Sequence, residues 1–160
     1  MPLFGSVTLA VNGEVSYGAG LSSKSYPVFK NYYAGGIGSV RGFFAGSLSV
    51  DGTGTTTSSS RFNLPIGGQA RVIMNAELQL PFPGTGVDRS LRWFTFLDAG
   101  QVFNPQYGQN ISLGDLRYST GLGISWISPV GPLKLSLGYP LNPQSFDRIQ
   151  RFQFQLGTGF

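Results

Sequence analysis

The sequence predicts an all-β fold, an antiparallel up-and-down transmembrane β-barrel to which this chain contributes about six strands. Three observations favour this fold. Six segments alternate apolar and polar residues with a period of two, the pattern of strands that have two different faces. These segments are longer than the strands of soluble sheets, and their apolar face carries no charged residue. A sheet with one face in lipid would show all three features.

The six segments cover residues 7–19, 69–80, 90–103, 116–128, 133–141 and 150–160. Five of them have at least 11 residues and the sixth has nine. Strands in soluble sheets average about 5–6 residues, whereas a tilted strand needs about 9–11 to cross a bilayer. Eight charged residues lie on the polar faces: Glu14, Arg71, Glu77, Arg92, Asp98, Arg117, Lys134 and Arg151. A soluble sheet would also keep charge off its core face, so strand length is the stronger argument for a membrane barrel.

Glycine and aromatic residues add to the same prediction. Gly falls on the polar face at seven positions: Gly18, Gly100, Gly121, Gly123, Gly138, Gly157 and Gly159. Gly weakens a strand that faces solvent, but on a lumen face it makes room for a loop folded inside. Aromatic rings lie near strand ends on the apolar face, where interfacial girdles are found: Tyr17, Trp93, Phe103, Tyr118, Trp126, Tyr139 and Phe160.

The composition excludes several classes of protein. The chain of 160 residues contains 24 Gly, no Cys and no His, and only 11% of its residues are charged, against about 25% in soluble domains. Disulfides, thiolate or imidazole metal sites and imidazole bases are therefore excluded, and we expect no metal, no cofactor and no enzyme activity. The net charge of +4 rests mostly on scattered Arg, so we expect no nucleic-acid partner.

The connections between the segments differ in length. Residues 84–86 and 129–132 are short turns rich in Gly and Pro, whereas residues 20–68 form a connection of nearly fifty residues. Outer-membrane barrels have short periplasmic turns and long outer loops. This alternation places residues 20–68, 104–115 and 142–149 together on the outer side of the membrane.

Six strands are too few to close a membrane barrel. Bacterial single-chain barrels have at least about eight strands, and unpaired strand edges are not tolerated in hydrocarbon. We therefore expect the chain to be part of a larger barrel, or to associate with itself.

The motif Val40-Arg41-Gly42-Phe43 ends a stretch, residues 32–43, that resembles the conserved loop of the BamA family of outer-membrane β-barrel assembly factors. The resemblance continues through residues 75–78, 96–103, 128–133 and 152–160, in the same order. The tetrapeptide alone is shared with two-partner secretion and other translocation pores of the same superfamily, and the later segments favour BamA. The resemblance implies that these are the last six of sixteen strands, preceded in the parent protein by further strands and periplasmic POTRA domains.

The resemblance also implies a role for Arg41. In the family the long loop folds into the lumen, and its Arg docks on acidic residues that match Glu77 and Asp98. Both carboxylates lie on the polar face assigned from the alternation alone. An Arg in a confined lumen needs such partners, because an unpaired charge away from water is costly. The alternative is that Arg41 is a solvated loop residue and that the carboxylates merely line a wet lumen.

The C-terminal segment resembles the signal by which outer-membrane proteins are recognised for assembly, with alternating apolar residues before a terminal aromatic: Phe152, Phe154, Leu156 and Phe160. In the family this strand meets the first strand at a weakly paired seam, which Gly157 would soften. The alternative is an ordinary lipid-facing strand that ends in a girdle residue, and the two interpretations are compatible.

These implications together describe a fragment of a non-enzymatic insertase in the outer membrane of a Gram-negative bacterium. Its expected partners are outer-membrane lipids, nascent outer-membrane proteins and, through the periplasmic domains, accessory assembly lipoproteins. Two alternatives remain: a two-partner secretion or other translocation pore of the same superfamily, and a soluble β-sheet module used for binding.

Overall fold

The computed structural model describes residues 2–4, 7–20, 26–48, 65–83, 90–105, 108–129, 131–145 and 147–157, with the backbone alone for residues 2–4. The predicted turn at 84–86, the terminal Phe160 and Gly159 lie outside these ranges. No helix within the described ranges is long and apolar enough to cross a membrane.

The predicted antiparallel β-sheet is confirmed. The strands are β1 (Pro2–Phe4), β2 (Val7–Tyr17), β3 (Gly42–Phe43), β4 (Ala70–Pro81), β5 (Leu91–Phe103), β6 (Arg117–Ser128), β7 (Gly131–Pro140), β8 (Ile149–Gln150) and β9 (Phe152–Leu156). Two short 3₁₀ turns, η1 (Val28–Lys30) and η3 (Leu113–Asp115), lie in the connections. The main sheet has the order β1-β2-β4-β5-β6-β7-β9, so its long strands follow one another in chain order, as in an up-and-down barrel.

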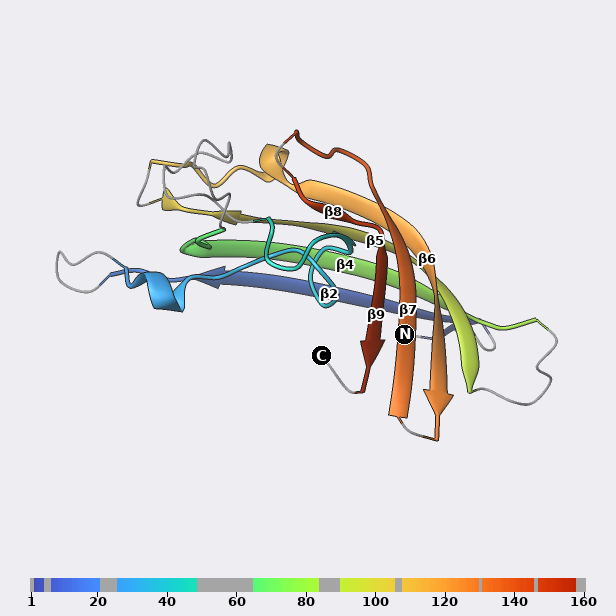
Figure 1. The fold of residues 1–160 in the computed structure, drawn as a ribbon. Coiled ribbons are helices and arrows are strands. Elements are labelled where there is room, and N and C mark those ends of the chain that lie inside the picture. Colours follow the sequence, from blue (N-terminus) through green and yellow to red (C-terminus); the bar gives the residue numbers. More distant parts are fainter. Residues whose placement is uncertain are drawn as a thin grey trace.

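The sheet is strongly curved and open. Figure 1 shows it turning from β2, which runs almost horizontally in the view, to β7 and β9, which run almost vertically. Each long pair is in continuous register, with twelve paired positions between β4 and β5. Within the described residues β1 and β9 are the two outermost strands and do not pair with each other.

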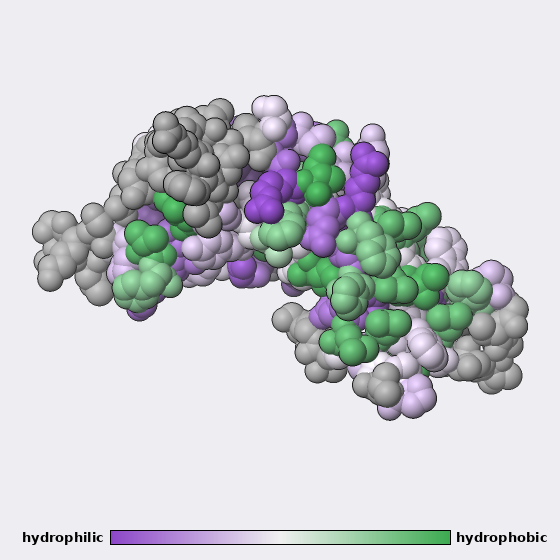
Figure 2. Space-filling model, viewed as in Figure 1, coloured by the Kyte–Doolittle hydropathy of each residue, from purple (hydrophilic) through white to green (hydrophobic). Residues whose placement is uncertain are grey.

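One face of the sheet, here called the outer face, exposes large apolar side chains. They are Val11, Val15, Tyr17, Met74, Leu97, Tyr118, Leu122, Ile124, Trp126, Leu137, Tyr139, Phe152, Phe154 and Leu156. All of these lie at the positions that the alternation assigns to the apolar face. Among the described strands the exposed Ile127 of β6 and Ile149 of β8 have the opposite parity. Figure 2 shows hydrophobic side chains gathered where Figure 1 places the ends of β6, β7 and β9. An apolar exposed surface of this extent marks contact with lipid or another partner.

The girdle prediction is wrong at one position. Phe103 is fully buried and packs with Ala70 and Leu116. The cause is strand overhang, since β5 runs on beyond Gly100, the last residue that pairs with β6. Leu116, which precedes β6, packs against the overhanging end of β5 and buries it.

The opposite face, here called the inner face, carries the principal core. Residues of the long connection pack against it: Ala34, Val40, Phe43 and Leu48 form one buried cluster with Ile73 of β4 and Val102 of β5. Ile73 is the one apolar residue on the polar parity of segment 69–80. Its apolar side chain is explained by the loop that covers it, because burial of apolar surface stabilises the docked arrangement.

Candidate loop-docking site

Residues 34–48, here called the docked loop, form a compact turn with its own backbone hydrogen bonds. The Gly36 N–H donates to the Val40 carbonyl at 3.0 Å, and the Leu48 N–H donates to the Ala34 carbonyl at 2.9 Å. These hydrogen bonds close the base of the loop. Its apex, which carries Arg41, contacts the inner face of the sheet.

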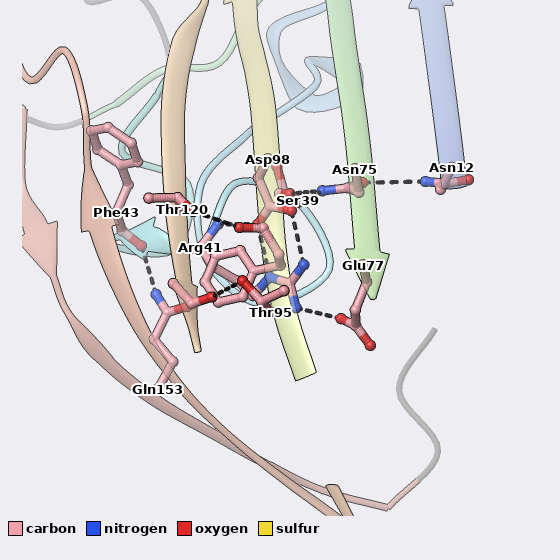
Figure 3. Close-up of polar contacts among 12 residues, drawn as sticks. Asn12, Ser39, Arg41, Phe43, Asn75, Glu77, Thr95, Asp98, Thr120 and Gln153 are labelled. Atoms are coloured by element: carbon pink, nitrogen blue, oxygen red, sulfur yellow. Dashed lines mark hydrogen bonds and ion pairs between the residues drawn. The ribbon is translucent and has the colours of Figure 1, made fainter. Parts of the chain in front are cut away.

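The Arg41 side chain lies between two carboxylates on neighbouring strands (Figure 3). Its Nε and Nη2 donate to the two oxygens of Asp98 on β5 at 2.7 and 2.8 Å, and its Nη1 donates to Glu77 on β4 at 2.6 Å. The Arg41 backbone N–H adds a bond to Asp98 at 3.0 Å. The planar guanidinium suits this arrangement, because its fork engages one carboxylate with two parallel bonds and leaves a donor for the second.

The ion pairs are buried. Asp98 is 0% exposed, and Arg41 and Glu77 are each 7% exposed. An ion pair removed from water is worth little over an apolar substitute, but the loss of one partner alone leaves a buried charge and costs about 3–5 kcal/mol. The cluster therefore acts as a geometric constraint that fixes where the loop apex sits.

An aromatic floor lies beneath Arg41. The carbon at the centre of its guanidinium is 3.7 Å from the ring centre of Phe96 and 5.7 Å from that of Phe94. The rings have space because Gly121 and Gly123 of β6 pair with Phe96 and Phe94, and a Cβ at either glycine would collide with the ring beside it. These lumen-side glycines thus make room for aromatic rings, and not for the loop itself. The face of an aromatic ring attracts a cation, so the floor adds to the hold on Arg41.

Two further side chains complete the cluster. Lys134 on β7 donates to both oxygens of Glu77 at 2.9 Å, so two cations face two carboxylates. Asn75 on β4 donates to Asp98 at 2.9 Å and to the backbone carbonyl of Ser39 in the loop at 2.6 Å. The charges are balanced, and Asn75 bonds the loop backbone next to the Arg41 anchor.

The Arg41 guanidinium stays protonated between the two carboxylates. Burial acts to lower the pKa of its guanidinium, but the hydrogen bonds and charges of Asp98 and Glu77 outweigh burial, so the pKa lies above its ordinary value. The side chain keeps its positive charge, and the ion pairs persist at any pH at which the carboxylates are ionised.

The loop also crosses β7 at a point where backbone meets backbone. Gly42 has φ +88°, and a Cβ built on Gly138 would lie 2.6 Å from the Gly42 nitrogen. Side chains cannot be accommodated at that distance, and the left-handed backbone of Gly42 also favours glycine. Gly138 therefore makes room for the loop, as the sequence pattern predicted for lumen-side glycines in general.

Gly138→Ala in the full-length protein should loosen the docked loop by about 1–3 kcal/mol, because its methyl group must displace the Gly42 backbone. Hydrogen exchange of residues 34–48 measures this effect as faster exchange. Ser136→Ala is the matched control, since it introduces the same side chain two residues earlier on the same strand. Unchanged loop exchange in Gly138→Ala would show that the close approach does not constrain the loop.

The structure thus brings together the loop motif and both of its sequence-assigned partners: Val40, Arg41, Gly42, Phe43, Glu77 and Asp98. The residues assigned to the C-terminal signal lie elsewhere. Phe152, Phe154 and Leu156 are exposed on the outer face of β9, Gly157 follows with φ +88°, and Phe160 lies outside the described residues.

Sequence reasoning missed four side chains around Arg41 and one further side chain, Gln153, which bonds the loop at the Phe43 carbonyl. They are Asn75, Phe94, Phe96, Lys134 and Gln153. All five occupy polar-face positions, and the two Phe are, with Val102, the apolar residues on the polar parity of segment 90–103. Aromatic residues at polar positions of a strand are a signal for a covered inner face.

The cluster holds the loop in place through paired charges. Both carboxylates are engaged by cations, and the described residues contain no group of three or more acidic residues able to hold a metal ion. Beside the cluster lies a cavity of about 530 Å³, lined among others by Ile37 and Ser39 of the loop and by Gln79 and Lys134 of the sheet. The arrangement holds a segment in place and leaves an open cavity next to it.

Comparison with known proteins gives consistent matches. Residues 1–160 match the Omp85 superfamily domain. The chain is 38% identical to the outer membrane protein assembly factor BamA of Neisseria meningitidis serogroup B over 99% of this chain and 22% of the relative. It is 32% identical to BamA of Nitratidesulfovibrio vulgaris, covering 84% of this chain and 16% of the relative. The chain therefore spans about a fifth of the length of these relatives.

A solved structure matches as well. The crystal structure of BamA from Haemophilus ducreyi lacking POTRA domains 1–3 superimposes with a TM-score of 0.78 at 31% sequence identity. The match covers 93% of this chain and 31% of that chain.

Proposed function

Since this chain belongs to the Omp85 superfamily, we propose that it forms the C-terminal part of the barrel of an outer-membrane assembly factor. The barrel would have sixteen strands and would lie in the outer membrane of a Gram-negative bacterium. The parent protein would insert nascent β-barrel proteins without enzymatic chemistry, and periplasmic domains outside this chain would bind accessory lipoproteins.

The observation that carries the proposal is the docked loop. The inner face binds a segment of the chain through buried ion pairs, while the outer face of the same strands exposes apolar side chains. A soluble sheet would not combine these two faces, because its solvent face would be polar. A sheet between lipid and a plugged lumen accounts for both faces. The named BamA relatives favour an assembly factor over a pore.

We propose that the last strand, β9, is the edge at which incoming strands pair. β9 pairs with β7 on one side, and within the described residues its other edge has no strand partner. A free edge offers unpaired backbone groups to an incoming strand, which is the basis of β-augmentation. We assign to Phe152, Phe154, Leu156, Gly157 and Phe160 the role of assembly signal and seam strand.

Depletion of the full-length parent from its bacterium tests the proposal. The expected result is loss of many unrelated β-barrel proteins from the outer membrane, with their unfolded forms accumulating in the periplasm. The competing function, a translocation pore, predicts instead that other barrels are unaffected and that the purified parent gives a stable ion conductance. That second result would overturn the assembly proposal.

A further inference from the structure

The docked loop contacts the end of the chain as well as the floor of the sheet. β3 pairs with β8, with Gly42 opposite Gln150 and Phe43 opposite Ile149. The Phe44 N–H donates to the Arg148 carbonyl at 2.7 Å. Among the described residues the backbone of 148–150 is thus hydrogen-bonded to the loop and not to the main sheet, while Asp147 before it pairs with Arg117 of β6.

The cause of this division lies in β7. The Gly138 N–H donates to the Arg151 carbonyl at 2.8 Å, so the β7 nitrogens of this parity point toward the last strand. Two residues on, Pro140 has no N–H and cannot continue the ladder. Residues 149 and 150 therefore do not pair with β7 and pair instead with β3 of the loop. Segment 150–160 was expected to be one strand, and the break at Arg151 divides it.

The main sheet consequently holds β9 weakly. Among the described residues Leu133–Leu137 pair with Phe152–Leu156, five positions against the twelve between β4 and β5. Cross-strand pairing is the unit of sheet stabilisation, so a strand with fewer pairs depends more on other contacts.

Gln153 supplies such a contact. Its side chain points from β9 to the inner face, is 4% exposed and donates from Nε2 to the Phe43 carbonyl at 2.7 Å (Figure 3). The opposite amide orientation would set two acceptor oxygens against each other, so the partner fixes which atom is the donor. Phe43 is fully buried and lies two residues after Arg41. One buried hydrogen bond thus joins the edge strand to the anchored part of the loop.

We propose that Gln153 is a positioning residue that fastens the C-terminal edge strand to the docked loop, so that loop docking and the position of β9 change together. The consequence for assembly rests on the function proposed above, whereas the fastening itself does not. Undocking of Arg41 would free β9 as well as the loop.

Hydrogen exchange of the full-length protein in lipid nanodiscs tests the fastening. Gln153→Met removes the donor, and Gln153→Glu keeps the side-chain shape but cannot donate when ionised. Both should raise exchange in residues 149–156 and 40–44 by roughly tenfold, because the Phe43 carbonyl loses its partner. Arg41→Ala should raise exchange in residues 149–156 as well.

The controls separate fastening from general loss of structure. Phe154→Met changes the next residue of β9, whose exposed side chain lies on the outer face, and should leave exchange at 40–44 unchanged. The proposal is overturned if Gln153 variants exchange like wild type, if Phe154→Met has the same effect, or if β5 exchanges faster to the same extent. If exchange rises as expected while assembly of other barrels stays normal, the fastening stands and the proposed use of this edge in assembly fails.

Discussion

Arg41→Ala in the full-length protein should release the docked loop from β4 and β5 and strongly reduce the assembly of other outer-membrane proteins. The substitution leaves Asp98, which is 0% exposed, without its cation, while Glu77 retains Lys134. Removal of one partner of a buried pair costs about 3–5 kcal/mol, which shifts the docking equilibrium about a hundredfold or more toward the free loop. Hydrogen exchange of residues 34–48 measures undocking, and growth after depletion of the wild-type protein measures function.

Arg92→Ala is the matched control for this variant. Arg92 lies near the start of β5, the strand that carries Asp98 further along, and is not part of the Arg41 cluster. Wild-type exchange and growth are expected for Arg92→Ala. If Arg41→Ala also behaves like wild type in both measurements, the ion pairs do not hold the loop.

A double-mutant cycle between Arg41 and Asp98 should give the second large effect. Arg41→Ala leaves the buried Asp98 without its cation, and Asp98→Ala leaves the buried Arg41 with Glu77 alone, whereas the double variant removes both side chains. The loss of docking free energy in the double variant should therefore be smaller than the sum of the two single losses by about 2–4 kcal/mol. The free energy is obtained from exchange protection of the loop in each variant.

The cycle also distinguishes a direct pair from general disturbance of the inner face. Asp115 is an exposed carboxylate in η3, and Arg41 with Asp115 should show additive losses. Additive losses for Arg41 and Asp98 as well would remove the claim that the two side chains act as one unit.

The alternation of the sequence was sufficient to place the docking partners on one face. Glu77 and Asp98 lie on the polar parity of separate segments, and antiparallel pairing of those segments puts them on neighbouring strands. Parity depends only on the two-residue period of a strand, which is local information. This is why the inner and outer faces could be predicted without knowledge of the register.

The aromatic floor depends on register and was not predictable in the same way. Phe96 lies under Arg41 because Gly121 is opposite it on β6, and the sequence alone does not state which residue of one strand meets which of the next. The two Phe were visible only as exceptions to the pattern.

The division of the last segment depends on its neighbour. Phe152, Phe154 and Leu156 alternate with polar residues, and the local sign of a break before them is the polar Gln150 on the apolar parity, which does not say where residues 149 and 150 pair. The break follows from Pro140 on the partner strand and from a loop more than a hundred residues earlier in the chain. Such long-range competition for backbone hydrogen bonds is absent from any local pattern.

The most direct test of the account is reconstitution of the full-length protein in liposomes, with the rate at which an unfolded outer-membrane β-barrel protein folds into them as the measurement. Wild type and Arg92→Ala should accelerate folding over protein-free liposomes, and Arg41→Ala should lose most of that acceleration. Equal acceleration by Arg41→Ala and wild type would contradict the claim that the docked loop holds the barrel in a form competent for assembly.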